Sequence, residues 1–173
     1  TLASLGFEEE ARLRGYALRD GRYDDARLLA RVRGIDAHPT PAEPSSAPRR
    51  RTTRPLHAQV RGAEADDWEA VALLFADPAV IDSTLQIPYQ SRDAIRDRLE
   101  NQPPDRHTLV AVLDEQVIGL LGLSFHDRRQ AHVVSLGMMV RSDYHGRGIG
   151  SALMEAALDL ADNWLNCYRI ELE

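Results

Sequence analysis

Three glycines at alternating positions, Gly146, Gly148 and Gly150, constrain the fold of this chain more than any other feature. Apolar residues recur at helical spacing from Ile149 to Trp164, and the preceding segment 131–140 has the apolar pattern of a strand. Glycine has no Cβ, so backbone N–H groups can wrap closely around an anion, and a helix start adds unpaired donors. A tight turn that binds nothing would not need three glycines. The sequence therefore predicts a strand, a phosphate-binding loop and a helix in succession.

Three kinds of nucleotide site could use such a loop. A Walker A loop requires Gly-Lys followed by Ser or Thr, and this chain contains no lysine. A Rossmann fingerprint has its first glycine at the end of the strand, whereas Arg141 to His145 separate strand and glycine here. Coenzyme A is the third possibility, and a family resemblance favours it.

Residues 136–154, Leu-Gly-Met-Met-Val-Arg-Ser-Asp-Tyr-His-Gly-Arg-Gly-Ile-Gly-Ser-Ala-Leu-Met, resemble motif A of the GCN5-related N-acetyltransferase (GNAT) superfamily. The core of that motif is Gln/Arg-x-x-Gly-x-Gly/Ala, and the chain departs from it only at His145. Trp68, the segment 85–88 and the segment 162–165 resemble a bacterial subgroup of small amino-acid N-acetyltransferases. The resemblance implies an acyltransferase with acetyl-CoA as cosubstrate and no metal. It implies that coenzyme A is held by Met138, Met139, Val140, His145, Gly146, Arg147, Gly148, Ile149, Gly150 and Ser151.

Residues 56–173 contain the elements of one GNAT domain. Apolar alternation predicts strands near 58–61, 107–113, 116–125, 131–140 and 168–172. Helical spacing predicts helices near 65–75, 93–100 and 149–164, and the segment 83–91 is predicted to be a loop. Antiparallel strands followed by one helical crossover predict an α/β (α+β) fold. We expect a mixed, mostly antiparallel central sheet with helices on both faces.

Residues 1–34 are predicted to form a β-hairpin, with strands at 7–18 and 26–32 around Asp20-Gly21. Residues 35–55 include five prolines and no apolar periodicity, which predicts a linker. In the resembling subgroup a segment similar to this hairpin follows the fifth strand, so the order is permuted here. An isolated hairpin is marginal in water, so we expect it to complete a GNAT sheet. A circular permutation, the junction of a tandem protein and a hairpin swapped with a neighbouring chain are all open.

The catalytic candidates follow from the resemblance, which implies direct transfer of acetyl from the thioester to an amine. A backbone N–H at Met139 or Val140 would polarise the thioester carbonyl. Ser135 stands where relatives often carry a carboxylate base and could hold a water, and His132 is the second candidate base. Leu2 stands where the family usually has the tyrosine that protonates the leaving thiolate.

Gln86 and Tyr89 would line the acceptor side by the same resemblance. Cys167 is predicted to be a small buried residue, because direct transfer needs no cysteine nucleophile. As the single cysteine, it excludes an internal disulfide and a multi-cysteine zinc site.

Composition excludes several other classes. The formal charge of −6 argues against nucleic-acid binding, and no apolar run approaches the roughly 18 residues that span a bilayer. Charged residues at 8–12 interrupt any signal-peptide pattern. We therefore expect a cytoplasmic protein with no nucleic-acid or membrane partner, and the resemblance implies a bacterial protein with a small-molecule amine as substrate. We also expect a homodimer, which would suit a swapped hairpin.

The predicted function is the transfer of acetyl from acetyl-CoA to the primary amine of a small molecule such as an amino acid. Two alternatives are open. A degenerate, non-catalytic CoA-binding or interaction module would explain the missing tyrosine. A protein N-terminal or lysine acetyltransferase would use the same fold, which does not determine the acceptor.

Overall fold

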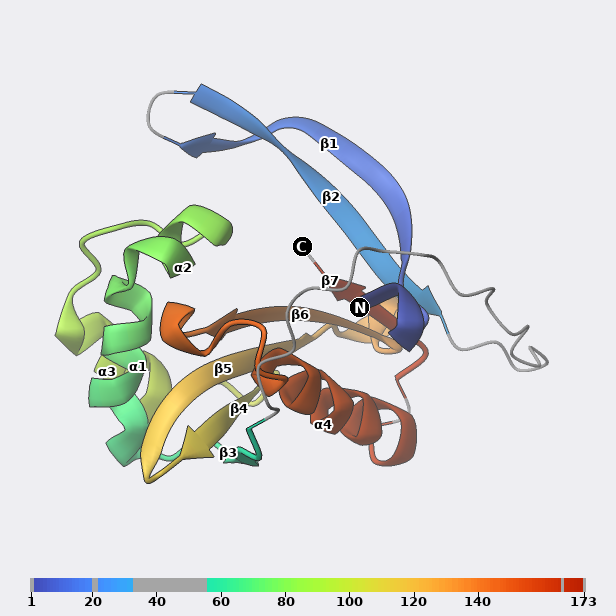
Figure 1. Cartoon of the computed structure of the whole chain (residues 1–173). Helices are drawn as coiled ribbons and strands as arrows, with labels where there is room; N and C mark the ends of the chain where they lie inside the picture. Colours follow the sequence, from blue (N-terminus) through green and yellow to red (C-terminus); the bar gives the residue numbers. More distant parts are fainter. Residues whose placement is uncertain (1, 20–21, 33–55, 166, 173) are drawn as a thin grey trace.

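The computed structural model describes residues 2–19, 22–32, 56–165 and 167–172 (Figure 1). Within them, one seven-stranded sheet runs in the order β1-β2-β7-β6-β5-β4-β3. The predicted linker at 35–55 and the turn at 20–21 lie outside the described residues.

Five strands form the part of the sheet predicted for residues 56–173. They are β3 (Gln59–Gly62), β4 (Arg106–Leu113), β5 (Gln116–Phe125), β6 (Val133–Val140) and β7 (Arg169–Leu172). β3 to β6 pair antiparallel in succession, whereas β6 and β7 are parallel. Parallel neighbours need a crossover, which α4 (Ile149–Asn163) provides. The predicted mixed, mostly antiparallel fold is confirmed.

Helices cover the two faces of this sheet (Figure 1). α4 packs on one face, and α1 (Trp68–Ala76) and α3 (Arg92–Glu100) pack on the other. Successive strand residues point to opposite faces, so buried Leu120 packs on the α1 side and buried Leu121 on the α4 side. None of the helices among the described residues is long and apolar enough to cross a membrane.

Gly119 lets α4 approach β5 closely. A Cβ at this position would lie 3.1 Å from Leu153 Cδ1 and 3.4 Å from the Met139 carbonyl oxygen. Both distances are at or below ordinary contact, so a larger residue would push the helix away. The close approach holds the first turn of α4, and with it the glycine loop, against the sheet.

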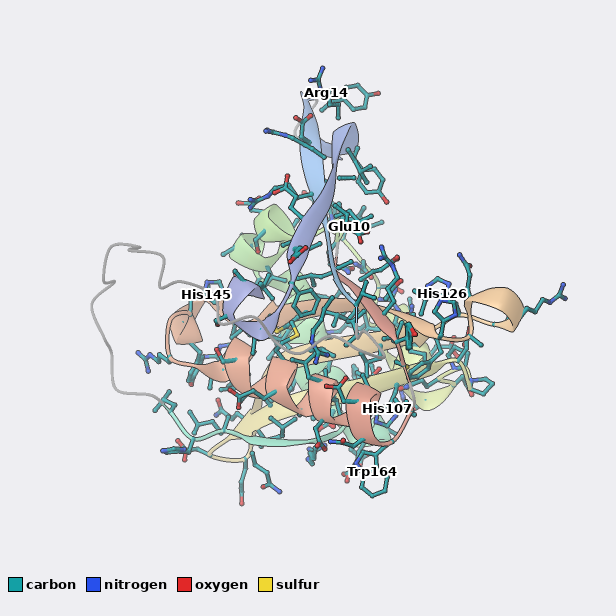
Figure 2. The ribbon with its side chains drawn as sticks, turned by 90° about the vertical axis from the view of Figure 1, so that its right-hand side faces the viewer. Glu10, Arg14, His107, His126, His145 and Trp164 are labelled. Atoms are coloured by element: carbon teal, nitrogen blue, oxygen red, sulfur yellow. The ribbon has the colours of Figure 1, made fainter. Side chains whose placement is uncertain are left out.

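The N-terminal hairpin consists of β1 (Glu8–Arg19) and β2 (Arg22–Val32). β2 pairs antiparallel with β7 of the same chain, and the far end of the hairpin projects beyond the sheet (Figure 1). Arg31 donates two hydrogen bonds to Asp162 at the end of α4, at 3.1 and 2.9 Å. Arg169 of β7 pairs with Glu10, which Figure 2 shows on the hairpin. The permuted order, the tandem junction and the swap stay predictions.

Four short helical segments of the described chain were not predicted, at residues 2–5, 78–83, 128–130 and 142–144. α2 (Pro78–Ser83) begins within the segment between the expected helices, and a 3₁₀ turn spans Leu2–Leu5. Asp77 caps α2 by accepting a hydrogen bond from the Ala79 N–H, at 2.9 Å, and Pro78 occupies the first helical position. One or two turns are too short for helical periodicity to be visible in a sequence.

Candidate active site

The glycine loop joins β6 to α4 through a 3₁₀ turn, Ser142–Tyr144. Gly146 and Gly148 have φ angles of 73° and 88°, in the left-handed region that other residues avoid. Gly148 is also the residue that precedes the first turn of α4. The backbone therefore requires glycine at these two positions, and it directs the N-terminus of α4 toward the loop.

Side chains on both sides fix the loop. The His145 Nε2–H donates to the Val140 carbonyl at 2.7 Å, because a carbonyl oxygen can only accept. Asp77 Oδ2 accepts from the Ser142 N–H at 3.0 Å. The guanidinium carbons of Arg141 and Arg147 lie 4.9 and 5.6 Å from the ring centroid of Tyr144. The loop is thus held by its own residues and by the cap of α2.

A cavity of about 380 Å³ lies along this loop. The residues predicted to bind coenzyme A line it with one exception: Met138, Met139, Val140, His145, Gly146, Gly148, Ile149, Gly150 and Ser151. Arg147 is the exception, and its guanidinium lies against Tyr144. Val80, Ser83 and Thr84 of the α2 region form part of the opposite wall.

The second half of β6 has an open edge. Residues 133–136 pair with β7, but among the described strands residues 137–140 pair only with β5. The Arg141 N–H bonds to the Ile118 carbonyl at 2.9 Å, and N–H directions alternate along an antiparallel strand. The N–H of Met139 therefore points to β5, and those of Met138 and Val140 point to the open edge. Of the two predicted carbonyl-polarising N–H groups, that of Val140 therefore faces the open edge and that of Met139 does not.

A second cavity, of about 510 Å³, adjoins the first on the α1 side of the sheet. Ser83, Thr84, Met138 and Met139 line both cavities. Its floor includes Gly122 of β5 and Gly137 of β6, which are directly paired. A Cβ added to either glycine would meet no atom within 4 Å. The missing side chains of this pair therefore contribute to the open space.

Ser135 lines the second cavity and contacts a histidine that was not singled out from the sequence. His126 Nε2 lies 2.9 Å from Ser135 Oγ. His126 directly follows β5, and its backbone N–H donates to the Val133 carbonyl at 3.3 Å, beside β6. Figure 2 shows His126 and His145 on opposite sides of the molecule. Only the folded connection between β5 and β6 brings His126 to Ser135, so spacing in the sequence did not indicate it.

The structure places His132 elsewhere. His132 precedes β6, its ring meets Tyr168 edge to face with centroids 6.1 Å apart, and it lines neither cavity. Of the two predicted acceptor residues, Gln86 lines the second cavity. Tyr89 is fully exposed and does not line it.

The hairpin contributes to the second cavity through Leu29, which pairs with Leu172 of β7 in the cavity wall. Leu2, at the position of the absent tyrosine, packs partly buried against the core. Cys167 is buried, and burial together with the charge of Asp162 raises the pKa of its thiol. A buried thiol of this kind is a core residue. Among the described residues, no three His, Cys, Asp or Glu side chains are grouped to hold a metal.

Comparison with known proteins identifies the family. A family model described as the acetyltransferase (GNAT) family matches residues 68–173. The L-amino acid N-acetyltransferase AaaT of Escherichia coli K12 is 40% identical over 114 residues, covering 65% of this chain and 70% of that protein. A GCN5-related N-acetyltransferase from Kribbella flavida is 30% identical with a TM-score of 0.53, covering 62% of this chain and 67% of that one. The ribosomal-protein-alanine N-acetyltransferase of Brucella melitensis is 26% identical with a TM-score of 0.53, covering 62% and 68%.

The glycine loop lies at the start of the crossover from β6 through α4 to β7. Together with these matches, this arrangement defines the protein as an acyltransferase of the N-acetyltransferase class. The chain belongs to the acetyltransferase (GNAT) family.

Proposed function

We propose that the protein transfers the acetyl group of acetyl-CoA to the primary amine of a small molecule, with an amino acid as the favoured acceptor. The observation that carries this proposal is the meeting of two cavities at Met138 and Met139. One cavity follows the glycine loop, whose close-approaching backbone and helix N-terminus suit a pyrophosphate. The other, of about 510 Å³, has room for a small amine. The name of the E. coli relative supports an amino acid as acceptor.

Met138 is the residue that we assign to the thioester carbonyl. Its N–H points to the open edge of β6, and the residue lines both cavities, whereas Val140 lines only the loop cavity. An N–H at that junction would donate to the carbonyl oxygen as negative charge develops on it. Because the donor is main chain, this role does not depend on the methionine side chain.

Ser135 and His126 form the proton path in this proposal. An amine enters as an ammonium and must lose one proton before its lone pair can attack the thioester carbon. Ser135 Oγ would accept that proton while passing its own to His126 Nε2, in the tautomer that has its hydrogen on Nδ1. His126 is exposed and can release the proton to water.

The leaving thiolate needs no tyrosine in this scheme. After attack, the C–S bond breaks and the nitrogen still carries one proton more than the amide product. That proton is transferred to the thiolate sulfur, either directly or through water, which gives the neutral amide and the free thiol of CoA. An ordinary thiol pKa of about 8.5 also makes the thiolate a tolerable leaving group. Leu2 therefore does not argue for a non-catalytic module.

Titration calorimetry of acetyl-CoA tests the first half of the proposal, with Gly148→Asp as the variant. The aspartate should abolish acetyl-CoA binding for two reasons: its carboxylate repels the pyrophosphate, and its Cβ is strained at the Gly148 φ angle of 88°. Gly6→Asp is the matched control, since Gly6 has a φ of 82° but lies in the N-terminal segment. Thiol release from acetyl-CoA with amino acids and polyamines tests the second half. Binding without any thiol release would support the non-catalytic module instead.

The remaining expectations are a cytoplasmic location and a homodimer, with exchange of the hairpin between chains as one of the three explanations for the permuted order. Sedimentation equilibrium tests the dimer. A monomer that contains the complete sheet would contradict the exchange.

A further inference from the structure

The second cavity carries an unusual distribution of charge. Its lining is mainly apolar, and its two ionised side chains are both arginines, Arg98 of α3 and Arg106 of β4. The lining includes no aspartate, glutamate or histidine. A small ligand in this cavity therefore meets only positive charge among the ionised groups.

Both arginines are exposed, and neither guanidinium group has a carboxylate partner among the described residues. Arg98 lies with its guanidinium carbon 5.3 Å from the centroid of Phe75, and its Nη2 donates to Gln90 Oε1 at 3.3 Å. Arg106 Nη2 lies 3.5 Å from Ser124 Oγ. Within the described part of the chain neither forms an ion pair, whereas Arg31, Arg61 and Arg169 do. A guanidinium fork that is not already paired with a carboxylate is suited to bind a planar carboxylate of a ligand.

The register places Arg106 within reach of the proposed proton path. Arg106 pairs with Ser124, and Ser124 pairs with Ser135, so the three residues form one row on the same face of the sheet. Two strand spacings separate the ends of the row, a distance of about 10 Å between backbones. An extended arginine side chain and an α-amino acid together can span this distance.

We infer that Arg106 and Arg98 bind the carboxylate of the acceptor, so that the protein selects an α-amino acid with an apolar side chain. The carboxylate would lie at the two guanidinium groups and the amine at Ser135, while the apolar side chain would contact Leu120 and Leu172. A polyamine carries only positive charge and is disfavoured here. A peptide N-terminus is disfavoured because it has no carboxylate beside its amine. This inference rests on the proposed function.

L-Leucine, L-leucinamide and putrescine test the inference, because leucinamide differs from leucine only in lacking the carboxylate. Acetylation should favour leucine in kcat/KM by roughly tenfold to a hundredfold, since a site built for a polar group rejects an analogue that lacks it. Arg106→Gln and Arg98→Gln should raise the KM for leucine and leave that for leucinamide unchanged. Arg92→Gln is the control, because Arg92 lies on the same helix as Arg98 but lines neither cavity.

Failure of the inference differs from failure of the proposed function. Equal rates with leucine and leucinamide, or a preference for putrescine, would overturn the inference and leave acetyl transfer standing. Absence of thiol release with every amine would remove the proposed function. In that case, titration calorimetry of leucine into the CoA-loaded protein still tests the inference. Leucine binding that is lost in Arg106→Gln would support it. Absence of leucine binding to the wild-type protein would overturn it.

Discussion

Asp77 Oδ2 accepts a hydrogen bond from the Ser142 N–H at 3.0 Å, which joins the start of α2 to the loop after β6. Asp77 Oδ1 accepts from the Ala79 N–H at the same time. Burial alone would raise the pKa of Asp77, but the hydrogen bonds from Ser142 and Ala79 outweigh it and lower the pKa. One carboxylate thus caps a helix and fixes a wall of the proposed coenzyme A cavity.

Asp77→Ala should weaken acetyl-CoA binding by roughly tenfold, since small displacements of binding groups are costly. It should also cost about 1 kcal/mol of stability through the lost cap. The folded-state pKa is lowered, so the contribution of Asp77 is complete above an ordinary pKa near 4 and is lost as pH falls through the lowered value. Calorimetry and urea unfolding measure both effects, with Asp93→Ala as control. Unchanged affinity would show that the loop does not depend on α2.

Gly122→Val should narrow the acceptor cavity without disturbing the fold. The new side chain projects into space where a Cβ has no neighbour within 4 Å, and β-branched residues suit strands. We expect the KM for bulky acceptors to rise severalfold while acetyl-CoA affinity stays unchanged. Gly62→Val in β3 is the matched control, because its Cβ also meets open space but lies outside both cavities. A loss of thermal stability confined to Gly122→Val would contradict this geometry.

Ser135→Ala and His126→Ala should each lower kcat by roughly a hundredfold, the usual worth of positioned acid–base catalysis. Because the proton passes through both residues, the double variant should be little slower than either single one. Steady-state kinetics of the three variants form a double-mutant cycle. His132→Ala should retain wild-type kcat, since His132 contacts Tyr168 and lines neither cavity. A larger loss of kcat in His132→Ala than in His126→Ala would contradict the role of His126 in the proton path.

Leu29→Ala should raise the KM for the acceptor and leave acetyl-CoA affinity unchanged, because Leu29 lines only the second cavity. Leu28→Ala in the same strand is the control, since Leu28 lines neither cavity. Equal effects of the two substitutions would mean that the hairpin acts only through stability.

Arg61→Met should destabilise the fold by roughly 3 kcal/mol at pH 7, because it leaves the buried carboxylate of Asp67 unpaired. Arg61 donates to both oxygens of Asp67, at 2.7 and 2.8 Å, and these hydrogen bonds lower the pKa of Asp67 against the opposing effect of burial. The stabilisation is therefore present above an ordinary pKa near 4 and lost as pH falls through the lowered value. Urea unfolding at pH 7 and pH 3 should show the gap between variant and wild type shrinking, with Arg92→Met as control.

The sequence predicted the parts of this molecule that depend on local spacing. Alternating glycines before an amphipathic helix indicated the loop, and nine of ten proposed coenzyme A residues line one cavity. Ser135 was predicted as a candidate base, but His126 beside it was not, because His126 reaches Ser135 only through the folded connection between β5 and β6. The carbonyl-polarising N–H was predicted at Met139 or Val140, and the alternation of strand hydrogen bonds leaves Val140 and Met138 as the two that face the open edge. The pairing of Gly122 with Gly137 depends on strand register, which periodicity does not reveal.

The pairing of Leu29 with Leu172 joins segments that are far apart along the chain. During synthesis β2 emerges long before β7, so the edge of β2 that pairs with β7 has no partner strand until β7 has been made. Contacts of such large sequence separation slow folding, and an unpaired strand edge is open to association with other chains. Strand β2 contributes Leu29 to the wall of the proposed acceptor cavity, so this cavity should form only after β7 has been made.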